Sequence, residues 1–128
     1  MLVDTDVLIW HLRGYSKATQ RLDQLPKLIL SAVTYMELVQ GMRNRSELLA
    51  LQKSLAMRQA ERLSLTSAIT ERAITLMETL ALSHGLQLGD ALIAATGLEH
   101  GLTVLTANTG HFSAVKDLQF ERFDPDTV

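Results

Sequence analysis

Short apolar segments alternate with longer segments of helical periodicity along this 128-residue chain, and no other feature restricts the fold as strongly. Parallel strands must be joined by crossover connections, which helices usually supply. The alternation therefore predicts an α/β fold of three layers, with a central, mainly parallel sheet flanked by helices. We expect a single domain over residues 1–128, because the sequence contains neither an internal repeat nor a linker.

The expected elements are short and closely spaced. We predict strands at residues 1–4, 28–31, 62–66, 102–106 and, at a sheet edge, 118–123. We predict helices at residues 6–12, 16–25, 34–42, 46–58, from 69 to near 85, and 90–100. The last helix is apolar on all sides, which suits a helix enclosed by protein.

Composition excludes several kinds of site. The chain has no cysteine, so disulfides, thiolate catalysis and cysteine-based metal centres are absent. No apolar stretch approaches the roughly 20 residues that a membrane span needs, and no leader segment opens the sequence. We therefore expect a soluble, cytoplasmic protein whose metal ligands, if any, are oxygen or imidazole groups.

Acidic and amide side chains follow the predicted strands. Asp4 and Asp6 lie at the carboxyl end of the first strand, and Asn108 lies just beyond the fourth. Asp90 stands at the start of the enclosed helix, and Glu37 joins the same region if its helix packs with that turn inward. Ligands of open α/β sheets bind outside the carboxyl ends of the strands. The pattern therefore predicts one polar site at this edge.

Each acid taken alone has a simpler explanation. Asp6 or Asp90 can cap a helix or interact with its dipole, and Glu37 can be a surface residue. Taken together they require a counter-ion, because two carboxylates about 4 Å apart repel by roughly 4 kcal/mol at an effective dielectric near 20. Hard oxygen ligands favour Mg²⁺ or Mn²⁺, and hydrolysis of a phosphodiester is the natural chemistry of such an ion.

Four segments, in order and spacing, resemble the motifs of PIN-domain ribonucleases, and most closely those of VapC-type toxins. They are residues 2–9, 31–38, 88–95 and 105–108, within a resemblance that covers residues 1–112. The resemblance implies that Asp4, Glu37 and Asp90 bind the metal ion. Asn108 departs from it, because many relatives have a fourth aspartate there. Thr5, Asp6 and Thr106 would then lie around the ligands.

The same resemblance implies a function. The chain would be a Mg²⁺- or Mn²⁺-dependent endoribonuclease and the toxin of a bacterial type II toxin–antitoxin system. Its partners would be an RNA substrate, a VapB-like antitoxin and a second copy of itself in a homodimer.

Two other functions are compatible with parts of the sequence. Asp4-Thr5-Asp6 also resembles the opening motif of haloacid-dehalogenase-type phosphatases, with Asp4 as nucleophile. That family would place an acid one helical turn after Asp90 and a lysine before it, yet residue 94 is Ala94 and no lysine lies between Lys53 and Lys116. The second alternative is a PIN-fold RNA-binding module without catalysis, to which Asn108 would point.

The remaining polar residues have competing interpretations. The histidines show no ligand spacing, so a zinc site is not expected. His111 either borders a substrate groove or has a structural role in the loop after Asn108. A group of basic residues either contacts phosphates or forms a solvated helix surface. It consists of Arg43, Arg45, Lys53, Arg58 and Arg62.

Overall fold

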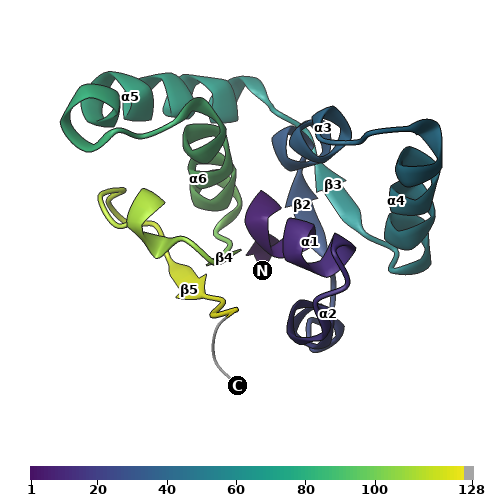
Figure 1. The fold of residues 1–128 in the computed structure, drawn as a ribbon. Coiled ribbons are helices and arrows are strands. Elements are labelled where there is room, and N and C mark those ends of the chain that lie inside the picture. The colour runs from purple at the N-terminus through teal and green to yellow at the C-terminus, as the bar shows by residue number, and fades with distance from the viewer. Residues whose placement is uncertain (126–128) are drawn as a thin grey trace.

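A computed structural model describes residues 1–125 of the chain. Each of the strands β1, β2 and β3 is followed by two α-helices (Figure 1). The elements are β1 (Leu2–Val3), α1 (Thr5–Leu12), α2 (Ser16–Asp23), β2 (Ile29–Ser31), α3 (Ala32–Gln40), α4 (Arg45–Met57), β3 (Glu61–Leu63), α5 (Ser67–His84), α6 (Leu88–His100), β4 (Val104–Thr106), the 3₁₀ helix η1 (Thr109–His111) and β5 (Phe120–Arg122).

The strands form one five-stranded sheet in the order β3-β2-β1-β4-β5. Every neighbouring pair is parallel, and Leu2 of the central strand β1 lies opposite both Ile29 of β2 and Val104 of β4. This arrangement confirms the predicted α/β fold with a parallel sheet. All strands consequently end at the same edge, as the prediction of a polar site there requires.

Successive strand residues point to opposite faces of the sheet, so the apolar strands present apolar side chains on both faces. Helices cover both of these faces. Leu2 and Val104 belong to a core cluster that includes buried residues of α5 and α6. Val3 and Leu105, the next residue of each strand, belong to a second cluster with buried residues of α1, α2 and α4. Figure 1 shows these two groups of helices on either side of the strands, which confirms the expected layers.

Some element boundaries differ from the predicted ones. Helix α3 begins earlier than predicted because Ser31 caps it, its hydroxyl accepting a hydrogen bond from the Val33 N–H (3.1 Å). Strand β3 was predicted at residues 62–66 but spans Glu61–Leu63, in register with β2. It ends there because Thr66 caps α5 by accepting from the Ile69 N–H (3.2 Å).

Helices α5 and α6 form a hairpin. Helix α5 ends at Gly85, whose φ of +67° is the left-handed conformation that glycine adopts readily at a helix end, and α6 packs back against α5. Among the described residues, no helix combines the length and apolar character that crossing a bilayer would take.

Candidate active site

The carboxyl ends of β1 and β4 hold the most buried acid of residues 1–125. Asp4 follows β1 and is 5% exposed. Its Oδ1 accepts a hydrogen bond from the Thr5 N–H (2.7 Å), so Asp4 caps α1, a role that the sequence suggested for Asp6. Its Oδ2 accepts from the hydroxyl of Thr106 at the end of β4 (2.8 Å). Two strand ends thus fix this carboxylate.

Asp6 points to the same strand end from the first turn of α1. Its Oδ2 accepts a hydrogen bond from the Ala107 N–H (3.1 Å) and lies 3.4 Å from the Thr106 hydroxyl. Its Oδ1 is buried, and the described part of the chain provides no hydrogen-bond partner for it. A buried carboxylate oxygen without a partner is costly unless a cation or a proton satisfies it.

Glu37 reaches the site from α3. Its Oε1 accepts a hydrogen bond from the hydroxyl of Thr5 (2.8 Å), which also lies 3.0 Å from the hydroxyl of the buried Thr34. Its Oε2 lies against Gly89 of α6, where an added Cβ would come within 2.9 Å of that oxygen. The absence of a side chain at Gly89 therefore leaves room for the Glu37 carboxylate against α6.

Asp90 and Asn108 are linked by a histidine. The Nδ1 of His111 lies 3.3 Å from Asp90 Oδ2, and its Nε2 lies 3.0 Å from Asn108 Nδ2. Both proposed functions of His111, at the groove and in the loop, are thus compatible with its place. Sequence reasoning did not connect it to Asp90, and it did not single out Thr34.

Burial and mutual repulsion make these acids hold protons more tightly. The pKa of Asp4 is raised to about 7, first by burial and then by the charge of Asp6. Burial is also the largest cause that raises the pKa of Asp6 and of Asp90. For Asp90, neighbouring His111 opposes the shift, while Glu37 adds to it. Repelling carboxylates of this kind favour a bound cation.

The donor set fits a hard divalent cation, although the side chains are not closed around one. Carboxylate oxygens predominate, and the unpartnered Oδ1 of Asp6 is a free ligand atom. Within residues 1–125, no three acids or histidines stand close enough together to hold an ion in their present positions. The acidic side chains are therefore held at strand ends and on helices without converging on one point.

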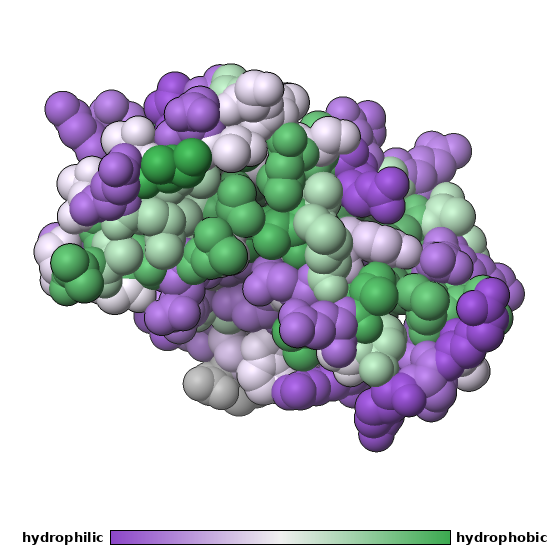
Figure 2. Space-filling view, turned by 90° about the horizontal axis from the view of Figure 1, so that it is seen from above, coloured by the Kyte–Doolittle hydropathy of each residue, from purple (hydrophilic) through white to green (hydrophobic). Residues whose placement is uncertain are grey.

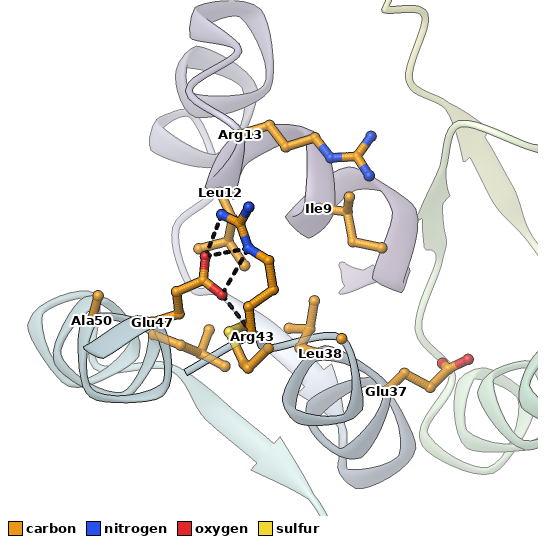
Figure 3. A pocket seen from close by; sticks show the side chains of 11 residues that line it. Ile9, Leu12, Arg13, Glu37, Leu38, Arg43, Glu47 and Ala50 are labelled. Carbon is orange, nitrogen blue, oxygen red and sulfur yellow. Dashed lines mark hydrogen bonds and ion pairs between the residues drawn. The ribbon is translucent and has the colours of Figure 1, made fainter. Parts of the chain in front are cut away.

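A cavity of about 670 Å³ adjoins the site between α1, α3 and α4. Figure 3 shows Glu37 at one end of it, with its carboxylate turned away from the apolar side chains of Ile9, Leu12 and Leu38. Arg43 and Glu47, which also line the cavity, form an ion pair with each other (2.7 Å).

The basic group predicted from the sequence is largely engaged within the protein. Besides Arg43, Arg58 pairs with Asp23 (2.9 Å), and the guanidinium of Arg62 lies 4.9 Å from the ring centre of Tyr35. Three of the five residues, Arg43, Arg58 and Arg62, thus have partners within the protein.

A parallel sheet with acidic side chains gathered at the carboxyl ends of its central strands is typical of α/β proteins whose ligands bind at that edge. Residues 1–118 match the family model of the PIN domain. The chain therefore belongs to the PIN-domain family, and this assignment confirms the resemblance drawn from the four motifs. It also leaves no support for the haloacid-dehalogenase interpretation.

Known relatives cover nearly the whole chain. Ribonuclease VapC10 of Mycobacterium tuberculosis is 38% identical over 125 residues, which span 93% of this chain and 90% of the relative. A toxin–antitoxin complex from Klebsiella pneumoniae contains a chain with a TM-score of 0.78 and 26% identity, covering 99% of this chain and 98% of its own. VapBC2 from Rickettsia felis, bound to a promoter DNA fragment, shares the fold at 18% identity (TM-score 0.81, covering 96% and 98%).

Proposed function

We propose that this protein is a metal-dependent endoribonuclease and the toxin of a toxin–antitoxin pair. The observation that carries the proposal is the pair of carboxylates, Asp4 and Asp6, held by Thr106 and Ala107 at the strand ends with one buried oxygen unpartnered. The similarity to a VapC ribonuclease over nearly the whole chain supports the substrate class.

Each acid has a proposed role in this activity. Asp4, Asp90 and Glu37 would hold Mg²⁺ or Mn²⁺, and Asp6 adds a fourth carboxylate through its free Oδ1. Held by these residues, a divalent ion would supply a site for water activation and charge neutralisation at the phosphate. Thr5 and Thr106 orient Glu37 and Asp4 by hydrogen bonds (2.8 Å each). The 2′-hydroxyl of RNA is then not needed as the nucleophile.

Cleavage of a structured RNA with added Mg²⁺ or Mn²⁺, and without either, tests the proposal. The expected products carry 5′-phosphate and 3′-hydroxyl ends, and Asp90→Asn should abolish cleavage. Glu78→Gln is the matched control, because Glu78 is an exposed acid on α5 that makes no contact with the cluster. Products with 2′,3′-cyclic phosphates would contradict the metal-water mechanism, and a wild-type protein that binds RNA without cutting it would favour the binding module.

We also propose a VapB-like antitoxin as partner, since the Klebsiella relative is a toxin–antitoxin complex. Without a metal ion, Asp4, Glu37 and Asp90 form a socket for a guanidinium, which is complementary to a carboxylate in charge and in hydrogen-bonding geometry. The cavity beside Glu37 supplies apolar contacts for a peptide segment. A segment that enters both would block the site.

A homodimer is the second proposed assembly. Large apolar side chains are exposed on the three helices α3, α5 and α6, and they include Met36, Ile74, Leu82 and Leu88. Figure 2, a view from above Figure 1, shows apolar residues gathered across this side of the molecule. A second copy of the chain is the proposed occupant of this apolar surface.

A further inference from the structure

Asn108, His111 and Asp90 form one chain of contacts that bridges the loop after β4 and the first turn of α6. His111 Nε2 lies 3.0 Å from Asn108 Nδ2, and Nδ1, on the other side of the ring, lies 3.3 Å from Asp90 Oδ2. The ring thus lies between an amide and a carboxylate that belong to different elements.

The loop that presents this ring is anchored at both ends. At its start, the Asn108 N–H donates to the Thr106 hydroxyl (3.0 Å), which itself donates to Asp4. At its end, the side chain of Phe112 is fully buried in the core, and the Phe112 N–H donates to Thr109 O (3.1 Å). His111 therefore holds its place although its side chain is half exposed.

The hydrogen-bond donors determine which way the contacts run. The Asn108 Nδ2 group can only donate, so His111 Nε2 accepts. The other ring nitrogen, Nδ1, faces Asp90 Oδ2 at 3.3 Å. The series of contacts consequently runs from Asn108 through His111 to Asp90.

We propose that Asn108 and His111 are positioning residues that orient the Asp90 carboxylate, and that Asn108 acts through His111 rather than as a metal ligand. The inference rests on the proposed metal site and refines it. With its amide nitrogen used on His111, Asn108 has a task that an aspartate at this position does not perform, since a carboxylate cannot donate to Nε2. The side chain of Asp90 is only 15% exposed, so the ring that lies 3.3 Å from its Oδ2 restricts the orientation of the carboxylate.

The affinity for Mn²⁺, measured by the electron paramagnetic resonance signal of free Mn²⁺, tests this arrangement without using activity. Partners that orient a metal ligand commonly contribute 10- to 100-fold to metal affinity. We expect His111→Ala and Asn108→Ala each to weaken Mn²⁺ binding by about tenfold or more. The double variant should bind no more weakly than His111→Ala alone, because Asn108 acts only through the ring.

Rescue and control variants separate positioning from a merely structural role. His111→Gln, whose amide can donate to Asp90, should bind Mn²⁺ more tightly than His111→Ala. His84→Ala, at an exposed histidine in the last turn of α5, should leave the affinity unchanged. If His111→Ala does not fold in EDTA, Asn108→Ala and His111→Gln still decide the question.

Three results would overturn the inference. Wild-type affinity in both His111→Ala and Asn108→Ala would exclude a positioning role. Additive losses in the double variant would show that Asn108 acts independently, as a direct ligand would. A wild-type protein that binds no Mn²⁺ would remove the proposed metal site itself. If Asp90→Asn weakened Mn²⁺ binding while His111→Ala and Asn108→Ala did not, the metal site would stand and only the role of His111 would be rejected.

Discussion

Among single residues, Asp4 has the largest expected influence on how stability depends on pH. Its pKa is about 7 in the folded chain because burial and Asp6 disfavour its charge, against 3.8 as its ordinary value. Between these values the folded state holds a proton that the unfolded state has lost. Stability therefore falls as the pH rises through this window, by at most about 1.4 kcal/mol per pH unit.

We predict that the metal-free protein unfolds at a higher urea concentration near pH 5 than near pH 8. Urea titrations in EDTA at both pH values measure the difference, and Asp4→Asn should reduce it. Saturating Mg²⁺ near pH 8 should recover stability, because the ion replaces the proton and binds only the folded state. A metal-free protein more stable near pH 8 would contradict the raised pKa of Asp4.

The sequence was informative about which residues meet, and less so about how they are held. Asp4, Asp6 and Thr106 were predicted near one strand edge because parallel strands share that edge, and the structure brings them within hydrogen-bond distance. The contact of His111 with Asp90 was not predictable, because it depends on how a 3₁₀ turn folds against α6. Metal binding by the acids stays a prediction.

At the scale of helices, the crossing of α3 and α6 sets the position of Glu37. An alanine Cβ at position 89 would come 2.9 Å from Glu37 Oε2 and 3.4 Å from its Cδ. Since that oxygen is the end of a flexible side chain, the helices can stay in place while the carboxylate moves. The substitution thus separates the geometry of the site from the stability of the fold.

We predict that Gly89→Ala leaves the melting temperature near that of the wild type, since alanine favours a helix over glycine by up to about 1 kcal/mol. Its Mn²⁺ affinity and cleavage rate should fall. Gly41→Ala is the matched control, because its Cβ would meet only backbone oxygens at ordinary contact distance (3.6 and 3.7 Å). Equal Mn²⁺ affinity in both variants would argue against Glu37 as a ligand.

Helix and strand types followed from the sequence more directly than their ends did. The apolar residues of 91–95 predicted a helix enclosed by protein, and α6 is indeed buried on several sides. The predicted boundaries of β3 were wrong because Leu65 continues the apolar alternation beyond Leu63, whereas the pairing with β2 stops at Leu63. Pairing between strands that are distant in sequence decides such ends, and local periodicity does not report it.

For the whole molecule, the proposed dimer is testable by mass. Light scattering at tens of micromolar protein should return about twice the chain mass of 14.2 kDa. The double variant Ile74→Glu, Leu82→Glu should shift the mass toward that of one chain, because Leu82 is fully exposed and charges there oppose burial. Met57→Glu, on the exposed surface of α4, should keep the dimer. A wild-type mass near one chain would contradict the proposal.

The last prediction joins the acidic site and the adjoining cavity into one binding surface for the antitoxin. If a guanidinium of the antitoxin enters the socket of Asp4, Glu37 and Asp90, it competes with the metal ion for the same carboxylates. Thermodynamic linkage then requires that each ligand weaken the binding of the other by the same factor. Calorimetric titration of the antitoxin should give a lower affinity with saturating Mg²⁺ than with K⁺ at equal ionic strength. Removal of one carboxylate by Asp90→Asn should reduce that difference, whereas Glu78→Gln should keep it. Equal affinities in Mg²⁺ and K⁺ would show that the antitoxin binds without using the metal ligands, and would leave the cavity between α1, α3 and α4 as the part of the proposed surface to test next.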